Sequence, residues 1–597
     1  MLVRIEVTIF LAISLRVLPL SMLAGSQFEA NLRSGDAFQV DDSLVVKTMD
    51  GRRGGTIVIS ERSEPRTFNP LTAIDGTSRN IVGLLMADLI HIDRYTQQSE
   101  AALAASWNVS SDGKEYTLHL RHGLRFSDGH SFDADDVLFT FEAYLDERNH
   151  SPQRDLLVIT SQPIRVRKVD SYTVAFTLPQ PYAAAERLFD SIAILPRHLL
   201  KTSFDNGTLA TAWGLNTPPS QIAGLGPFRV KAYVPGQSLQ LERNPYYWKK
   251  DVRGNRLPYL DEINALFVSS ADIEAIRFGA GEFDVIDRLS AANFSVLEKE
   301  QQQRAFHLYD LGPGLEYNFL VFNLNDLPPD GSRSPISKSW FQQRAFRQAV
   351  SSAIDRASIV RLAYRGRAYP LSIQISPGNK LWLDRAIAPP SRSLEQSRQL
   401  LRQAGFSWRA DQTLIDSRGN AVRFSIMHNS AKPEQAQMAV IIQQDLKELG
   451  IDVTLVPQEF RTLVDRIFTT YKYEAVIMAL ADGDSDPNSE MNVLSSNGNA
   501  HVWSLRTTEP PPPWQQEIDR LMQEQLTVLD YPRRKRLFDQ VEELVWKNAP
   551  VVFLVSPHIL VGAKDRIGNF HPAVLGNYTL WNAEELFIRQ PQHLAGH

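Results

Sequence analysis

The sequence predicts an α/β protein made of several lobes, and three observations lead to this fold class. The chain has 597 residues, more than one hydrophobic core usually serves. Short segments with alternating apolar residues are interspersed with longer segments of helical periodicity. Helices that follow strands in this way pack against a sheet in α/β lobes. Hydrophobic residues make up 43% and charged residues 22% of the chain, the balance of an ordinary soluble globular protein.

The first half of the chain contains clear strand and helix signals. Thr56 to Ser60 follows a Gly-Gly pair and predicts a short buried strand. Residues 106–126 predict a hairpin, because a Ser-Asp-Gly turn precedes apolar residues at alternate positions. Asp133 is placed to cap a helix with an apolar stripe at helical spacing. Residues 224–248 predict two strands around a Pro-Gly turn.

The second half predicts more helices, with strands between and after them. Residues 344–366 have the apolar spacing of one helix, and residues 434–450 predict a helix that ends at Gly450 before a strand. Two consecutive helices are expected in residues 513–550. The apolar run 551–563 then predicts one or two buried strands.

The overall charge and the absence of cysteine exclude several classes of function. The net charge is −5, from 63 basic and 68 acidic residues, so no basic excess favours a nucleic-acid partner. The basic run Arg533 to Arg536 is interpreted as a solvated helix face. Without cysteine there are no disulfides, thiolate metal sites or cysteine nucleophiles.

The N-terminal residues indicate export. The apolar run 7–15 follows an early arginine and is too short to span a bilayer, so we expect a signal peptide over residues 1–30. Residues 23–26 are similar to a bacterial lipoprotein signal with Ser26 in place of the lipidated cysteine. We therefore expect a periplasmic protein without a lipid anchor. A misassigned start codon or a buried N-terminal helix are the alternatives. Residues 31–49 are polar and are expected to form a loose arm, and no later segment could cross a membrane.

A search for catalytic motifs finds none. The sequence lacks His-Glu-x-x-His, Gly-x-Ser-x-Gly, a Walker loop and a Gly-x-Gly-x-x-Gly between a strand and a helix. His119 and His122 fall on a predicted strand and its turn, without a matching carboxylate, and are interpreted as surface or core residues. We predict no catalytic residue, cofactor or metal site.

One acidic loop offers three interpretations. Asp482, Asp484 and Asp486 follow an apolar strand at alternate positions. A calcium loop of the EF-hand type is excluded, because its sixth and twelfth positions would be Pro487 and Val493. Paired acid–base carboxylates face each other across a substrate, which neighbours in one loop rarely do. A receptor for a cationic group and a solvated turn that caps the next helix remain open.

The chain resembles the extracellular solute-binding proteins of ATP-driven importers, specifically the large oligopeptide/dipeptide-binding family (family 5). The order and spacing of the similar segments carry this resemblance along nearly the whole chain. They are GGTIVI with EPRTFNP, ADLIHIDRYTQQSEAALAASWNVSSDGKEYTLHLRHGLRFSDGHSFDADDVLFTFE, GLGPFRVKAYVPGQSLQLERNPYYW, RAFRQAVSSAIDR, SRQLLRQAGF and YPRRKRLFDQVEELVWKNAPVVFLV.

The resemblance implies a two-lobed periplasmic-binding-protein fold of the large type, with an extra subdomain on the first lobe. Ligand would bind between hinged lobes that close over it. The implied division is domain I over 50–90, 214–315 and 556–597, domain II over 91–213, and domain III over 316–555.

The resemblance also implies a role for the acidic loop. In peptide-binding relatives, an aspartate a few residues before an acidic-Pro pair holds the α-ammonium group of the ligand. Asp486-Pro487 is that pair here, which places the expected position at Gly483. Asp484 is therefore the first choice and Asp482 the second, and Asp486 is expected to act as a structural cap.

Five further residues are candidate ligand contacts. Asn499, His501 and Trp503 follow the acidic loop, and Trp503 could form an apolar wall of the site or belong to the core. Tyr317 and Asn318 lie at the expected crossover into domain III.

The implied function is capture of a peptide or related small solute and its delivery to the membrane permease of an importer. The protein would do no chemistry, because other subunits hydrolyse ATP, and we expect a monomer. A sensory receptor that presents ligand to a signalling partner is the alternative. A secreted hydrolase is a further one, against which the missing catalytic motifs argue.

Overall fold

The computed structural model describes most of the chain, in several ranges. The described ranges are 42–48, 51–325, 339–389, 391–481, 484–505, 507 and 510–590. The expected signal peptide lies outside them, as does the first part of the expected arm. Residues 44–46 of that arm form strand β1 (Leu44–Val46), which pairs with β13 (Lys249–Asp251). This part of the arm is therefore held by a strand pair, which differs from the expectation of a loose segment.

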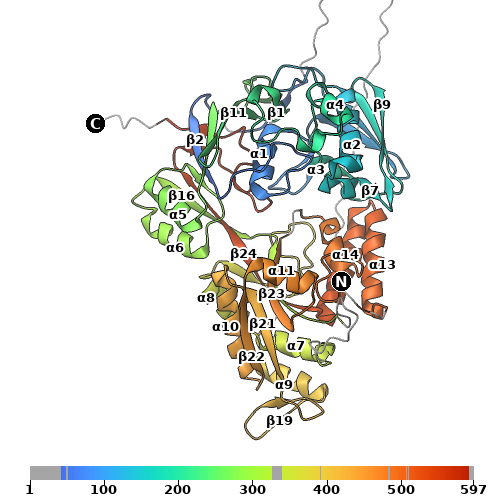
Figure 1. Cartoon of the computed structure of the whole chain (residues 1–597), viewed down its shortest axis with the longest axis vertical. Coiled ribbons are helices and arrows are strands. Elements are labelled where there is room, and N and C mark those ends of the chain that lie inside the picture. Colours follow the sequence, from blue (N-terminus) through green and yellow to red (C-terminus); the bar gives the residue numbers. More distant parts are fainter. Residues whose placement is uncertain are drawn as a thin grey trace, which may run out of the picture. The chain divides into compact units, whose positions relative to one another are not determined.

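Twelve strands of the described chain form one mixed sheet (Figure 1). Its path runs through β11 (Phe228–Val234), β12 (Ser238–Arg243), β14 (Glu262–Phe267), β2 (Thr56–Glu61), β15 (Val285–Ile286), β24 (Val551–Lys564), β17 (Glu316–Phe322), β23 (Ala475–Ala481), β21 (Arg423–Asn429) and β22 (Asp452–Gln458). Strands β16 (Phe306–Pro313) and β18 (Ala368–Pro370) also pair with β24.

Strand β24 belongs to both halves of this sheet. Its first residues pair with β17, where Val551 lies opposite Val321. Its last residues pair with β15 and β16, where Lys564 lies opposite Phe306. The sequence allowed one or two strands here, and the structure has a single strand of 14 residues. In Figure 1 this strand extends from the region of β23 to the region of β16.

A first hydrophobic core, hereafter the first core, gathers buried residues from Ile57 to Ala265 and from the C-terminal segment. It lies around β2, β11, β12, β14 and the elements between β2 and β11. These are α1 (Gly76–Leu85), β3 (Ile90–Ile92), β4 (Ser99–Ala101), β5 (Ala104–Val109), β6 (Glu115–Leu120), α2 (Ala134–Leu145), β7 (Val158–Ile159), β8 (Gln162–Pro163), β9 (Arg165–Asp170), β10 (Thr173–Thr177), α3 (Ala185–Ser191) and α4 (Arg197–Asp205). Because this core joins residues of the expected domains I and II, their division stays a prediction.

Local signals explain the elements of this part. The 106–126 segment forms the expected hairpin, with β5 and β6 paired around the Ser-Asp-Gly turn. Asp133 caps α2, and its side chain accepts a hydrogen bond from the backbone N–H of Asp135. Strands β5, β6, β10 and β9 form a separate antiparallel sheet.

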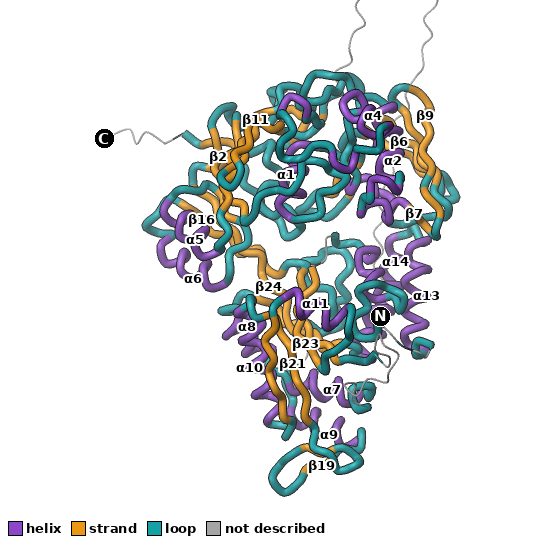
Figure 2. Tube along the Cα trace, in the orientation of Figure 1, coloured by secondary structure: helices purple, strands orange, loops and turns teal. Residues whose placement is uncertain are grey.

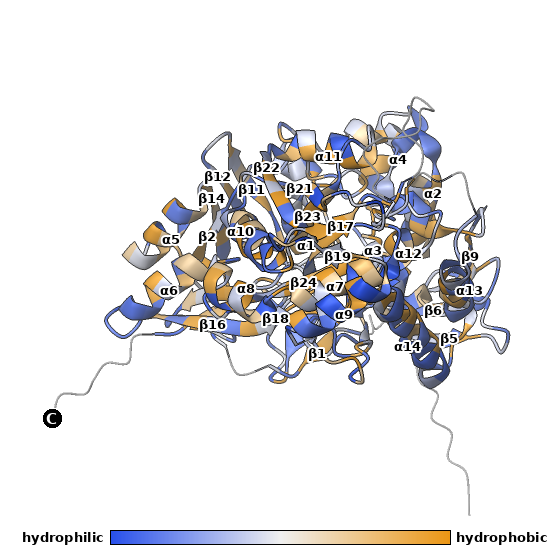
Figure 3. Cartoon of the chain, turned by 90° about the horizontal axis from the view of Figure 1, so that it is seen from below, coloured by the Kyte–Doolittle hydropathy of each residue, from blue (hydrophilic) through white to orange (hydrophobic). Residues whose placement is uncertain are grey.

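A second hydrophobic core, hereafter the second core, gathers buried residues from Tyr317 to Val555. Its helices are α7 (Arg344–Ala353), α8 (Arg356–Ala363), α9 (Leu394–Gln403), α10 (Pro433–Lys447), α11 (Phe460–Phe468), α12 (Met491–Leu494), α13 (Pro513–Thr527) and α14 (Tyr531–Asn548). Figure 2 shows these helices beside the strands, and in Figure 3 the strands near β17 and β24 are mostly hydrophobic while α14 is largely hydrophilic. Helices α5 (Ala271–Ala280) and α6 (Ala291–Glu300) pack around a smaller third cluster.

The expected single helix over 344–366 is two helices. Helix α7 ends at Ala353, and Asp355 caps α8 by accepting a hydrogen bond from the N–H of Ser358. The backbone N–H of Asp355 donates to the carboxylate of Asp445 on α10, 2.8 Å away. Apolar periodicity continues across this break, which is why the sequence alone did not reveal it.

The remaining described strands are short: β19 (Ser407–Trp408), β20 (Leu414–Ile415), β25 (Ile567–Gly568) and β26 (Phe587–Ile588). Among the described helices, none has the length and apolar character needed to cross a bilayer.

Candidate functional site

A cavity of about 820 Å³ is lined by residues from both halves of the large sheet. Most of the lining comes from around the first core, from the end of β2, from α1, from the β3–β4 region and from residues 574–581. Glu316 at the start of β17 and Ala481 at the end of β23 reach it from the second core. A volume of this size is typical of a pocket for a small molecule.

Charged side chains of both signs line this cavity. The acidic residues are Glu61, Asp88, Glu100, Asp190, Glu274, Asp287, Glu316 and Glu584, and the basic residues are Arg62, Arg79, His91, Arg94, Lys249 and Arg288. Because charges of both signs line one cavity, it can hold a ligand that itself carries both a cationic and an anionic group.

Three acidic residues of the cavity, Glu61, Glu274 and Asp287, differ in how their carboxylates are paired. Glu274 is satisfied by Ser60 Oγ at 2.6 Å and by Arg62 Nε at 3.0 Å. In contrast, Asp287 Oδ1 is buried and finds no hydrogen-bond partner among the described residues. Burial raises the pKa of Asp287 to about 6 and the pKa of Glu61 to about 7. A bound cation would favour the ionised form of both carboxylates.

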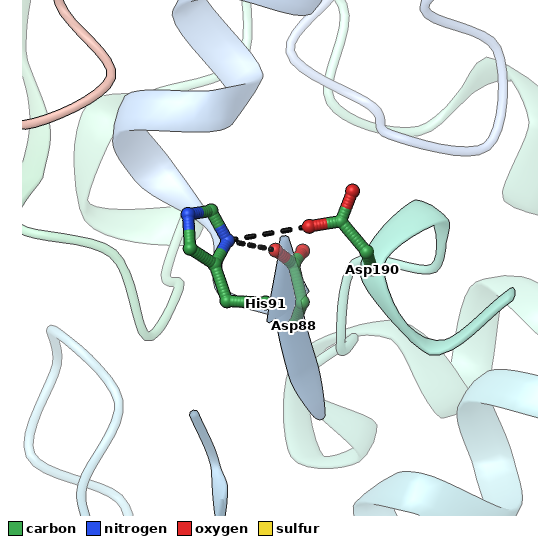
Figure 4. A group of neighbouring side chains, drawn as sticks. All are labelled: Asp88, His91 and Asp190. Atoms are coloured by element: carbon green, nitrogen blue, oxygen red, sulfur yellow. Dashed lines mark hydrogen bonds and ion pairs between the residues drawn. The ribbon is translucent and has the colours of Figure 1, made fainter. Parts of the chain in front are cut away.

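A second group combines a histidine with two aspartates (Figure 4). His91 Nδ1 lies 3.3 Å from Asp88 Oδ2 and 3.3 Å from Asp190 Oδ1. Burial alone would lower the pKa of His91, but the two carboxylates outweigh it and raise this pKa to about 9. Burial raises the pKa of Asp88 to about 6. Burial opposes ionisation of Asp190 too, yet the charges of Arg94 and His91 prevail and lower its pKa.

The acidic loop after β23 is only partly described. Asp482, the second choice for an ammonium receptor, lies outside the described residues. Asp484 forms an ion pair with Arg187 of α3, and Arg187 Nη2 also donates to the carbonyl oxygen of Gln97 at 3.0 Å. Burial raises the pKa of Asp484 to about 6, although the charge of Arg187 acts in the opposite direction. Asp484 does not line the cavity, so its ligand-binding role stays a prediction.

Asp486 has the structural role that the sequence indicated. It caps the 3₁₀ turn Pro487–Glu490, accepting a hydrogen bond from the N–H of Asn488 at 2.9 Å. Its two carboxylate oxygens also accept hydrogen bonds of 2.7 and 2.6 Å from Arg534. Arg534 is buried, so the interpretation of the 533–536 run as a solvated helix face is wrong for this residue.

The three candidates after the acidic loop differ in their environment. Asn499 is exposed, whereas His501 and Trp503 are buried in contact with each other, with ring centroids 4.0 Å apart. His501 Nδ1 lies 2.9 Å from the carbonyl oxygen of Val493. Trp503 packs in the second core, which was the alternative left open for it. None of the three lines the cavity.

The two candidates at the start of β17 are also buried. Tyr317 Oη lies 3.3 Å from Glu490 Oε2, and Asn318 Nδ2 donates to Glu316 Oε1 at 3.4 Å. Of this trio on β17, Glu316 is the residue that lines the cavity. Contacts of Tyr317 and Asn318 with a ligand therefore stay a prediction.

The sequence reasoning missed the cavity residues around the first core. A usable signal was present in Asp88, His91 and Arg94, three titratable residues that flank or lie on a short apolar strand. Their partner Asp190 lies on α3, far away in the sequence, so the cluster appears only once the chain is folded.

Comparison with known proteins places the chain in a family. The family model for bacterial extracellular solute-binding proteins, family 5 (middle region), matches residues 98–501. The chain belongs to this family. Its members bind solutes outside the cytoplasm, which agrees with the resemblance seen in the sequence.

Two curated relatives cover most of the chain. It is 26% identical over 544 residues to a probable ABC transporter-binding protein of Deinococcus radiodurans, covering 87% of this chain and 90% of the relative. It is 24% identical over 545 residues to the oligopeptide-binding protein AppA of Bacillus subtilis, covering 90% and 92%.

A solved structure supports the fold. The ABC transporter substrate-binding protein CtaP of Listeria monocytogenes matches with a TM-score of 0.74 at 21% identity, over 90% of this chain and 100% of that one. The predicted two-lobed α/β fold is confirmed.

Proposed function

We propose that this protein is the solute-binding component of an ATP-driven importer, that it captures a peptide or related small solute in the cavity, and that it delivers this solute intact to the membrane permease. The single observation that supports the proposal best is the cavity of about 820 Å³, lined by charges of both signs from both halves of the sheet. A free peptide carries an ammonium and a carboxylate group, so it matches such a lining.

The charged residues of the cavity suggest how the solute is held. Asp287 and Glu61 offer carboxylates for a cationic group, and Arg288 offers a guanidinium for an anionic one. Glu316 and Ala481 approach from the second core. A solute that contacts both sides favours the arrangement in which they are close together, because it makes both sets of contacts only there.

The Arg187–Asp484 pair bears on which solutes fit. In this structure an internal guanidinium already neutralises the carboxylate that the resemblance assigns to the ammonium of a ligand. We infer that the cationic group of the solute is received by Asp287 and Glu61 instead. In this proposal the protein acts as a monomer and releases the solute chemically unaltered.

Native mass spectrometry of the purified protein tests the proposal directly. We expect a noncovalent complex with one small molecule per chain, and release of that molecule unaltered on denaturation. A released molecule that the protein converts on prolonged incubation would point to an enzyme and overturn the proposal. Failure to bind any member of a broad peptide and solute library would do the same.

Calorimetry with the identified solute tests the assignment of residues. Glu61→Gln and Arg288→Ala should each weaken binding at least about tenfold, or about 1.4 kcal/mol, if they receive the two charged groups. Glu517→Gln is the matched control, because Glu517 lies outside the cavity in an exposed ion pair with Arg520. Unchanged affinity in both cavity variants would contradict the assignment.

A further inference from the structure

The cluster of Asp88, His91 and Asp190 brings three metal-ligating atoms to one point of the cavity wall. His91 Nδ1 lies 3.3 Å from an oxygen of each carboxylate, and all three potential ligand atoms lie within 4.8 Å of one another. Figure 4 shows both carboxylates directed at the same ring nitrogen. All three side chains line the cavity and remain partly accessible from it.

These distances are long for hydrogen bonds between charged groups. Such bonds usually measure about 2.7–2.9 Å from nitrogen to oxygen. A single N–H would have to be shared between the two carboxylates in a bifurcated hydrogen bond. In contrast, ligand atoms about 2.0–2.2 Å from a tetrahedral Zn²⁺ ion are separated by about 3.3–3.6 Å, from the geometry of the tetrahedron. The separations of 3.3 Å in the cluster match this spacing.

Neighbouring groups hold the side chains of the cluster in place, as the hydrogen-bond partners of metal ligands do in known sites. The backbone N–H of Ile92 donates to Asp190 Oδ1 at 2.7 Å. Arg94 Nη2 lies 3.3 Å from Asp190 Oδ2 and 3.4 Å from Asp190 Oδ1. His91 lies on β3 and Asp190 on α3, so regular elements fix both.

We propose that Asp88, His91 and Asp190 form a binding site for a divalent transition-metal ion of the Zn²⁺ class, with one coordination position open to the cavity. One nitrogen and two carboxylate oxygens are a donor set that such ions accept. Two carboxylates balance the charge of the ion, and Arg94 remains beside them. The open position would hold water or a donor atom of a bound solute. This site does not depend on which solute the cavity takes.

Titration of metal-free full-length protein with Co²⁺ and Zn²⁺ tests the site. Tetrahedral Co²⁺ absorbs strongly in the visible range, so we expect one equivalent of Co²⁺ to produce these bands and Zn²⁺ to abolish them. His91→Gln and Asp190→Asn should each weaken the binding of Zn²⁺ by about 100-fold, since even outer partners of a metal site contribute about 10–100-fold.

His198→Gln is the matched control. His198 Nε2 contacts a single carboxylate, Asp128 Oδ2 at 2.7 Å, outside the cavity. This variant should bind Co²⁺ like the wild type. Thermal melts of each variant without metal show whether it is folded, and Asp88→Asn replaces any variant that is not. Absence of the Co²⁺ bands in the wild type, or unchanged Zn²⁺ affinity in folded His91 and Asp190 variants, would overturn the site. If solute still binds when the metal site is disproved, the proposed importer function is unaffected.

Discussion

His501 illustrates how burial sets the chemistry of a single side chain. It is 2% exposed and packs against Trp503 in the second core, with one ring nitrogen 2.9 Å from the carbonyl oxygen of Val493. Burial lowers the pKa of His501 from 6.5 to about 4. The imidazole is therefore neutral in the folded protein at neutral pH. A neutral imidazole can still donate one hydrogen bond, which His501 makes to the carbonyl oxygen of Val493.

Because the pKa of His501 is lowered on folding, the free energy of unfolding should depend on pH in the acidic range. Between pH 6.5 and about 4 the unfolded chain binds a proton at His501 that the folded chain does not. The free energy of unfolding should therefore fall as the pH falls through this window, by about 3 kcal/mol in total. His501→Gln should remove this part of the pH dependence, measured by urea denaturation at pH 7.5 and pH 4.5.

The control for this prediction is His307→Gln, at an exposed position. It should leave the pH profile unchanged. If His501→Gln and the wild type lose the same free energy between the two pH values, His501 is not the responsible group.

Some residue roles could be predicted from sequence and others could not. The cap at Asp486 follows from its place before Pro487, because capping is a local property. Its ion pair with Arg534 joins residues far apart in the sequence, so a basic run that looked solvated holds one buried member. The cavity acids Glu61 and Asp287 were missed for the same reason, since no local pattern marks them.

At the scale of elements, strong local signals were reliable. The 106–126 hairpin, the helix capped by Asp133 and the helix that ends before Gly450 formed as predicted. The break between α7 and α8 was missed, because it depends on a hydrogen bond from Asp355 to Asp445 of another helix. Periodicity reports the buried face of a segment and not whether its axis is continuous.

Close backbone packing at α1 gives a prediction about glycine. A Cβ at Gly226 would lie 2.5 Å from the carbonyl carbon of Leu85, at the C-terminal end of α1, and the N–H of Gly226 donates to Leu85 O at 2.9 Å. Gly226→Ala should lower the free energy of unfolding by about 1–3 kcal/mol or more, because backbone must shift to make room. Chemical denaturation measures the change.

Gly83 within the same helix is the matched comparison. A Cβ there meets nothing within 4 Å. Gly83→Ala should instead raise stability by about 0.5–1 kcal/mol, because alanine is the better helix former. Equal effects of the two substitutions would show that the contact with Leu85 does not limit residue 226.

At the scale of the whole molecule, two kinds of connection join the first and second cores. The covalent ones are β24 and the consecutive strands β16 and β17. The noncovalent ones include Arg187 with Asp484, and Gln97 Nε2 donating to the carbonyl oxygen of Gly378 at 2.8 Å. The second kind can break without unfolding either core, so it can separate during opening.

Arg187→Ala tests this view of opening. Loss of the pair with Asp484 should favour the open arrangement, so small-angle scattering without solute should give a larger radius of gyration than the wild type. Saturating solute should bring both proteins to the same value. The affinity of the variant for solute should fall about threefold to tenfold.

Arg520→Ala serves as the control, because Arg520 is exposed and pairs with Glu517 and Glu524 of its own helix. Identical scattering of Arg187→Ala and the wild type, with and without solute, would show that the pair does not hold the cores together.

The fold class could be predicted because length, alternation of elements and family segments extend along the whole chain. The site could be predicted only in part. The resemblance directed attention to Asp484, whose carboxylate is paired with Arg187, while the cavity lies chiefly against the first core. The exact domain boundaries and the ligand contacts stay predictions, because both depend on how distant segments meet.

The shared strand also governs when the protein can fold during synthesis. Residues 551–564 complete both halves of the large sheet, so β15 and β17 each lack a neighbour until the ribosome has made almost the entire chain. Long-range strand pairing of this kind is slow to form. A nascent chain therefore cannot complete this sheet for nearly the whole of its translation.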